Sequence, residues 1–321
     1  MAFSRPGSTP HTRQVTVKPL HLVAGLSADM VFLRAFGSAG FNGRVHSVFQ
    51  RVINIERPGG GLFTLACRDL DNAPDSVLVD SADFSDVQVV AHQRVTTVGK
   101  LMRVGPSLGI QFDAIKAWTG ELPLYPHDTS LLRRNLNVLT GHLQRTTDGG
   151  GMLRLPTGGS AFEHEVSAAL AKRSGCLCEA LLCRDLEEAR VHAKSMIGLG
   201  PGLTPSGDDY LVGLFAALNV GRSPGLALRC TCLGMIAGAE LATNAISYAA
   251  LSKAATGRVR AALSDFIERL LHGTEFDFLA PLTRVLAIGS TSGSDIVAGI
   301  VSGLRLQLEF GRAMKPASAG V

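Results

Sequence analysis

The sequence lacks the features of nucleic-acid-binding, membrane and secreted proteins. Only 18% of its 321 residues are charged and the longest basic run is Arg133–Arg134, so a dense basic stripe for a nucleic acid is missing. No stretch of about 18 residues is continuously apolar, as a membrane-spanning helix requires. The segment Met1–Gln14 has no apolar region of the secretory type. We therefore expect a cytoplasmic protein with a disordered segment at 1–14 and with neither nucleic acid nor membrane as a partner.

Several catalytic and metal-binding motifs are also missing. No Lys-Ser or Lys-Thr follows a glycine-rich loop, and no second histidine follows His164 at the spacing of a zinc protease. No Gly-x-Ser-x-Gly nucleophile elbow is present. Two Cys-x-Cys pairs occur among the six cysteines, but structural zinc sites use longer spacers. The sequence therefore predicts free thiols and no dedicated metal cage.

Strand patterns and helix patterns occupy different parts of the chain. Short apolar runs separated by turn residues fill the first third, and apolar residues at helical spacing follow it. This segregation predicts an α+β protein with a small β-barrel or sandwich over 15–122 and a mostly helical domain over 123–315. The expected strands are 15–26, 43–56, 61–67, 76–79, 87–90 and 95–104. The expected helices are at about 130–145, 160–175, 177–197, 207–219, 224–242, 244–256, 258–272, 275–288 and 293–310.

A glycine-rich loop, Gly198–Asp209, is the most distinctive segment of the chain. So much glycine indicates positive φ angles or close backbone approach. The loop lies between two helical patterns, Ala189–Ile197 and Tyr210–Asn219. Its end has a copy near the C-terminus, because Ser206–Gly213 and Ser292–Gly299 both read Ser-Gly-x-Asp-x-x-x-Gly. Two similar helix starts predict a site built where they converge.

Part of each copy has a purely structural interpretation. Ser206 with Asp209, and Ser292 with Asp295, match the capping box, in which a serine N-cap precedes an acid at the third helical position. Capping requires neither the additional acid Asp208 nor the surplus glycines of the first loop. These extra residues are the stronger indication of a binding or catalytic role.

The chemistry expected at these helix starts is mixed. Free N–H groups near Gly207 and Gly293 would bind an anion, whereas the carboxylates favour an amide N–H or a cation. The mixture suits a ligand with an anionic end and an amide end. It also suits a phosphate with Mg²⁺ at Asp208 and Asp209, and the residues alone leave both alternatives open. If a cation assists the anionic group, Arg44 and Lys253 are its candidates, but the sequence favours neither strongly.

A third stretch, Thr243–Ser247, belongs to the same prediction. Thr243 and Ser247 are four residues apart and share one helix face. They are expected either to contact the ligand or to bond to carbonyl groups of the preceding turn.

Four segments carry a resemblance to a known family. Gly200–Asp209 with Gly213 resembles the hallmark motif of the AllH-like family. Val45–Phe49 resembles the N-terminal β motif of that family, Thr243–Ser247 its Thr-Thr-x-x-Ser helix start, and Gly289–Asp295 its Gly-x-Thr-Ser-Gly-x-Asp signature. The resemblance covers most of the chain.

The resemblance implies a subunit of an oxamate carbamoyltransferase of allantoin catabolism, a part of purine degradation. Such an enzyme moves a carbamoyl group between oxalurate and phosphate, giving oxamate and carbamoyl phosphate, and its partners are other carbamoyltransferase subunits. Both kinds of ligand carry anionic and amide groups. Three positions depart from the family pattern: Asn244 replaces a second threonine, and Ser290 and Ser294 replace bulkier residues.

The leading hypothesis is therefore a carbamoyltransferase subunit that binds a small anionic or amide-bearing substrate. The alternatives are a metal-assisted amide or N-glycosidic hydrolase, and a non-catalytic ligand-sensing or scaffold subunit. We expect Asp208→Ala to abolish ligand binding and to leave folding nearly intact. The candidate catalytic residues are Asp208, Asp209 and Asp295. The candidate substrate-binding residues are Gly200, Gly202, Thr204, Ser206, Gly207, Thr243, Asn244, Ser247, Thr291, Ser292 and Gly293.

Overall fold

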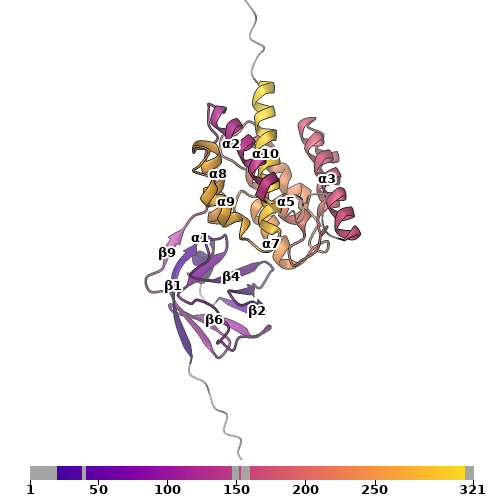
Figure 1. Ribbon diagram of the computed structural model, residues 1–321. Coiled ribbons are helices and arrows are strands. Elements are labelled where there is room, and N and C mark those ends of the chain that lie inside the picture. Colours follow the sequence, from indigo (N-terminus) through magenta and orange to yellow (C-terminus); the bar gives the residue numbers. More distant parts are fainter. Residues whose placement is uncertain (1–19, 38–40, 147–151, 153–159, 315–321) are drawn as a thin grey trace, which may run out of the picture.

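The computed structural model describes residues 20–37, 41–146, 152 and 160–314 (Figure 1). Strands come first and helices follow, which confirms the expected α+β fold. The disorder expected at 1–14 lies outside the described residues. None of the helices in the described ranges is both long and apolar enough to cross a membrane.

The N-terminal part is a β-barrel that closes through its first strand. Strand β1 pairs with β5 on one side and with β8 on the other, so eight strands form a ring, and β9 adds to β1. Turn residues separate these strands as the sequence predicts. The strands are β1 (His21–Asp29), β2 (Asn42–Val48), β3 (Val52–Glu56), β4 (Leu62–Cys67), β5 (Ser76–Val79), β6 (Arg94–Val98), β7 (Leu101–Val104), β8 (Leu108–Gln111) and β9 (Lys116–Trp118).

Some barrel expectations were wrong in detail. The expected single runs 43–56 and 95–104 are the hairpins β2–β3 and β6–β7, and 87–90 forms no strand. A short helix, α1 (Met30–Gly37), interrupts the strands. Its Phe32 is buried against Phe63 in the barrel core, with ring centroids 4.8 Å apart. This aromatic contact holds α1, for which the sequence predicted no element, against the barrel core.

The C-terminal part is a helical domain, drawn above the barrel in Figure 1. Its helices are α2 (Ser130–Thr146), α3 (Ala161–Leu182), α4 (Leu186–Met196), α5 (Ser206–Leu218), α6 (Arg229–Ile236), α7 (Ala245–Ala254), α8 (Ala261–His272), α9 (Leu279–Leu286) and α10 (Ser292–Met314). A capping box formed by Ser160 and Glu163 opens α3.

Several helix boundaries differ from the expectation. The expected helix 177–197 is divided between the end of α3 and α4, and the expected helix 275–288 is the shorter α9. Helix α3 continues through Gly175 to Leu182 because glycine is tolerated within a helix at a cost of about 1 kcal/mol. The expected helix 224–242 is instead a 3-10 turn (Leu226–Leu228) followed by α6.

Helices α5 and α10 form the centre of the helical domain. Every residue of α5 is buried, as expected for a helix surrounded by others. Gly213 of α5 faces the backbone at Ile296, and Gly299 of α10 faces the backbone at Tyr210. A Cβ atom at either glycine would collide with the opposing carbonyl oxygen. The sequence repeat therefore serves first to bring two helix backbones into contact.

Ion pairs join the barrel to the helical domain. Arg258 Nη2 lies 2.7 Å from Asp29 Oδ2 and 2.9 Å from Asp75 Oδ1, and both acids belong to the barrel. Arg260 forms a second pair with Asp71. Because these aspartates come from different barrel segments, the pairs fix the helical domain against one side of the barrel.

The glycine contact can be tested by substitution. Gly299→Ala should lower the free energy of unfolding by about 1–3 kcal/mol or more, because overpacking forces the helices apart. Chemical denaturation measures this change. The control is Gly175→Ala in α3, where an added Cβ meets no atom within 4 Å and should raise stability by roughly 0.5–1 kcal/mol. Equal effects of the two substitutions would contradict the packing described.

Candidate functional site

The starts of α5 and α10 meet and exchange side-chain contacts. The hydroxyl of Ser292, at the start of α10, hydrogen-bonds to the carboxyl of Asp209 in α5. In return, the hydroxyl of Ser206, at the start of α5, hydrogen-bonds to Asp295 in α10. Together with the reciprocal glycine contacts, this gives a local pseudo-two-fold arrangement. The convergence predicted from the sequence repeat is therefore present.

The capping-box interpretation of Ser206 was wrong. Ser206 is the first residue of α5, the N-cap is Pro205, and no side chain caps the helix. α10 likewise begins at Ser292 itself. Both serine hydroxyls contact the other helix because the close crossing places a buried carboxyl within their reach.

The backbone N–H groups of Gly207 and Gly293 are not available to an anion. Gly207 N donates to Leu199 O at 2.9 Å, and Gly293 N donates to Ile288 O at 2.9 Å. These two N–H groups therefore do not contribute to the anion site expected near them. Both glycines instead allow the helix starts to pack against the ends of the preceding helices, since a Cβ there would collide with Met196 and Val285.

The surplus glycines of the loop have a structural cause. Gly198 has a φ of 77° and Gly200 a φ of 121°, where residues with a Cβ are strained. At Gly198 a Cβ would also collide with the carbonyl oxygen of Ala242, and at Gly200 it would crowd Ser206. Gly202 also has positive φ, at 102°, but space is open around it.

Asp208 is buried and holds three segments together. Its Oδ1 accepts a hydrogen bond from Gly198 N at 2.8 Å. Its Oδ2 accepts hydrogen bonds from Thr243 Oγ1 and, at 2.6 Å, from Ser247 Oγ. The predicted shared helix face is wrong, because Thr243 precedes the N-cap of α7, but both hydroxyls still meet at Asp208. Since both oxygens of Asp208 are used, the structure gives this residue a structural role.

Asn244 also has a structural role, because it is the N-cap of α7. Its side-chain oxygen accepts hydrogen bonds from Ile246 N and Ser247 N, and its Nδ2 donates to Leu203 O at 2.6 Å. The departure from the family pattern at this position therefore preserves a polar link between α7 and the glycine-rich loop.

Asp209 and Asp295 differ from Asp208 because each keeps an unused oxygen. Within the described residues, the Oδ2 atoms of Asp209 and Asp295 are buried without a hydrogen-bond partner. Burial is the main reason that the pKa of Asp209 rises to about 7, and the charge on Asp295 adds to the rise. Burial likewise raises the pKa of Asp295 to about 6. Near neutral pH these two carboxyls can hold or release a proton.

A cavity of about 600 Å³ lies between the barrel and the helical domain. Asp209 lines it, together with the predicted residues Gly202, Thr204, Thr291 and Ser292. The other predicted residues do not line the cavity and support it from behind: Gly200, Ser206, Gly207, Asp208, Thr243, Asn244, Ser247, Gly293 and Asp295. Strands β3 and β4 supply the opposite wall, including Asn54 and Thr64.

The cavity also contains cations, of which the sequence suggested only one. Lys253, Arg258 and Arg260 line it, whereas Arg44 does not. Both arginines are bound to barrel aspartates, but Lys253 Nζ is 3.6 Å from its nearest acid, Asp75. Burial lowers the pKa of Lys253. The charge of Asp75 opposes this effect of burial, and this one long ion pair leaves N–H groups of Lys253 for an anionic ligand. Arg258 and Arg260 lie near Lys253 in sequence, but only the fold shows that they face a cavity.

Asp208 and Asp209 do not form the paired site that the sequence suggested for Mg²⁺. In the described part of the chain, no group of three or more His, Cys, Asp or Glu side chains is placed to hold a metal ion. Asp208 and Asp209 also face different partners, since Asp208 bonds to α7 and Asp209 to Ser292. The two carboxyl groups therefore do not face a common position where one ion could bridge them.

Comparison with protein families gives two matches along the chain. Residues 24–117 match the AllH family N-terminal domain, which corresponds to the barrel. Residues 196–304 match the oxamate carbamoyltransferase subunit AllH, a stretch that includes α5, α7 and α10. No solved structure matches the chain.

Removing the Asp208 carboxylate should destabilise the protein, contrary to the expectation from the sequence that folding stays nearly intact. Asp208→Ala leaves one buried N–H and two hydroxyls without an acceptor, so we expect a loss of about 3 kcal/mol or more in the free energy of unfolding. Urea denaturation measures it, with the exposed Asp113→Ala as the control. A loss below about 1 kcal/mol would contradict the structural role given to Asp208.

The raised pKa of Asp209 predicts a pH dependence. A carboxyl whose folded-state pKa is raised contributes stability that is present below its ordinary pKa and is lost as the pH rises through about 7. The side chain of the Asp209→Asn variant does not titrate. From pH 5 to pH 8 the free energy of unfolding of this variant should therefore rise by about 2–3 kcal/mol relative to that of the unsubstituted protein. Denaturation at both pH values measures this. For the exposed control Asp113→Asn, the stability difference from the unsubstituted protein should be the same at both pH values. The same result for Asp209→Asn would contradict the raised pKa of Asp209.

Proposed function

The chain belongs to the AllH family, and we propose that it is a carbamoyltransferase subunit that binds a carbamoyl-bearing substrate in the interdomain cavity. The proposed reaction moves a carbamoyl group between an oxalurate-type ureido acid and phosphate. The products in one direction are oxamate and carbamoyl phosphate. This assigns the protein to allantoin catabolism, with other carbamoyltransferase subunits as its partners.

The observation that carries this proposal is the presence of opposite functional groups in one cavity. Asp209 has a free carboxyl oxygen on the side of the helix starts, and Lys253 provides a cation in the same lining. Burial of both groups strengthens their interactions with a ligand because the local dielectric constant is low. A ligand with an amide end and an anionic end complements this pair.

Each end of the substrate has a matching partner. The carbamoyl N–H groups can donate to the carboxyl oxygen of Asp209, which has no other hydrogen-bond partner in the described residues. The carboxylate or phosphate end can accept from Lys253. Thr204 Oγ1 and Ser292 Oγ are 2.7 Å apart beside Asp209 and supply hydroxyl groups for the same ligand. A cavity of about 600 Å³ accommodates both substrates, since ligand sites span roughly 300–1,000 Å³.

The reaction requires one bond to form and one to break. In the direction of carbamoyl phosphate, a phosphate oxygen bonds to the ureido carbon, and the bond from that carbon to the oxamate nitrogen breaks. The departing nitrogen takes up one proton. Asp209, whose pKa is about 7, is the group in the cavity that is suited to hold this proton near neutral pH. Lys253 would stabilise the negative charge on the transferring group.

Ligand titration tests the proposal. Oxalurate and carbamoyl phosphate should each raise the melting temperature of the purified protein, whereas Mg²⁺ alone should not. Asp209→Asn should weaken carbamoyl phosphate binding roughly tenfold or more, because it removes a charge-assisted hydrogen bond. In the enzyme assembled with its partner subunits, the same substitution should lower the rate of carbamoyl transfer.

The matched controls separate ligand contact from folding. Arg44→Ala removes a cation that lies outside the cavity and should leave binding unchanged. The melting temperature of each variant without ligand shows whether it is folded. If neither oxalurate nor carbamoyl phosphate shifts the folded protein, a non-catalytic scaffold role replaces the proposal.

A further inference from the structure

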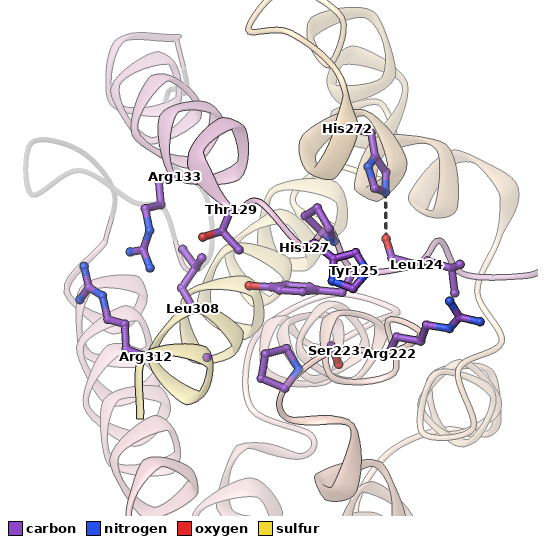
Figure 2. A pocket seen from close by; sticks show the side chains of 13 residues that line it. Leu124, Tyr125, His127, Thr129, Arg133, Arg222, Ser223, His272, Leu308 and Arg312 are labelled. Atoms are coloured by element: carbon purple, nitrogen blue, oxygen red, sulfur yellow. Dashed lines mark hydrogen bonds between the residues drawn. The ribbon is translucent and has the colours of Figure 1, made fainter. Parts of the chain in front are cut away.

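A second cavity, of about 770 Å³, lies among the helices of the C-terminal part (Figure 2). Its walls come from the segment that leads into α2, from the turn after α5, and from the last part of α10. It shares no lining residue with the interdomain cavity. It is therefore a separate site, and the proposed carbamoyl chemistry does not account for it.

Backbone contacts hold the walls of this cavity in place. Tyr125 N donates to Gly221 O at 2.7 Å, and Gly221 N donates to Pro123 O at 2.9 Å. Figure 2 also shows the 2.8 Å hydrogen bond between His272 Nε2 and Leu124 O. The cavity is thus formed before any ligand binds, which lowers the ordering cost of binding.

The lining is strongly cationic. Arg133, Arg222 and Arg312 all line the cavity, and no aspartate or glutamate does. Arg312 Nη1 lies 2.9 Å from Glu309 Oε1, so one positive charge is compensated. Within the described residues, no ion pair is formed by Arg133 or Arg222. The lining therefore carries a net positive charge, which favours an anionic ligand such as a phosphate monoester.

A buried hydroxyl group provides an independent indication of a ligand. In the described part of the chain, Tyr125 Oη is buried without a hydrogen-bond partner. Burial raises the pKa of Tyr125 to about 12, so this group remains a hydrogen-bond donor at neutral pH. Figure 2 shows the hydroxyl on the same side of the cavity as Thr129, Arg133 and Arg312. Several donors therefore face one region, and an acceptor there would satisfy them.

We propose that this second cavity binds a phosphate-bearing small molecule. The phosphate would accept hydrogen bonds from Arg133, Arg312 and the Tyr125 hydroxyl, since guanidinium groups recognise phosphate in a bidentate way. The rest of the ligand would pack against the Tyr125 ring, Pro224 and Leu308, which line the remainder of the cavity. The volume is large enough for a nucleoside monophosphate.

Calorimetric titration of the full chain with AMP and with adenosine tests this proposal. AMP should bind with one-to-one stoichiometry and lose affinity as salt concentration rises, whereas adenosine should not bind detectably. Inorganic phosphate is not used as the probe because the interdomain cavity is proposed to accept it. Arg133→Ala should weaken AMP binding roughly tenfold to a hundredfold, the effect of losing hydrogen bonds from a charged group.

Two variants locate the site. Arg134→Ala removes the neighbouring arginine of α2, which does not line the cavity, and should bind AMP as before. Tyr125→Phe should weaken AMP binding several-fold and leave the melting temperature of the free protein unchanged or higher, because it removes an unpartnered hydroxyl. Absence of AMP binding, equal binding of adenosine, or equal affinities of Arg133→Ala and Arg134→Ala would each overturn the proposal.

Discussion

The backbone contact between α5 and α10 is the constraint on which the rest of the helical domain depends. Glycines at 213 and 299 remove the side chains that would keep the two helices apart. The close crossing brings the helix starts together and buries Asp209 and Asp295 between them. It also places Ser206 and Ser292 within reach of the opposite helix. The close contact of the two helix backbones, encoded by the repeated glycine pattern, therefore shapes both the core of the helical domain and one wall of the interdomain cavity.

The three aspartates at this junction differ in their roles: Asp208 stabilises the fold, whereas Asp209 and Asp295 keep carboxyl oxygens without partners in the described residues. Both carboxylate oxygens of Asp208 accept hydrogen bonds, one from the glycine-rich loop and one from α7. Asp208 therefore holds these two segments together behind the cavity wall. Asp209 and Asp295 keep buried, unpartnered oxygens, which costs stability when they are ionised. Such unsatisfied groups in an otherwise complementary core are expected where a protein binds ligand. The barrel completes the arrangement, since its ion pairs with Arg258 and Arg260 close the opposite side of the cavity.

Local patterns in the sequence were sufficient for the class of fold and for the convergence of the two helix starts. They misled on Ser206, because a capping box and a contact between helices use the same residue types. These patterns gave no structural role for Asp208, because its hydrogen-bond partners are brought together only by the fold. The partners are Gly198, Thr243 and Ser247. The arginines of the second cavity, at 133, 222 and 312, are almost 180 residues apart at most, and no periodicity links them.

The central claim is that the interdomain cavity binds the carbamoyl-bearing substrate between Asp209 and Lys253. A crystal structure of the protein with oxalurate tests it most directly. The ligand should lie in that cavity, with its carbamoyl nitrogen within about 3 Å of an Asp209 oxygen and its carboxylate facing Lys253. Oxalurate bound elsewhere, or a cavity that stays empty at saturating ligand, would contradict the claim.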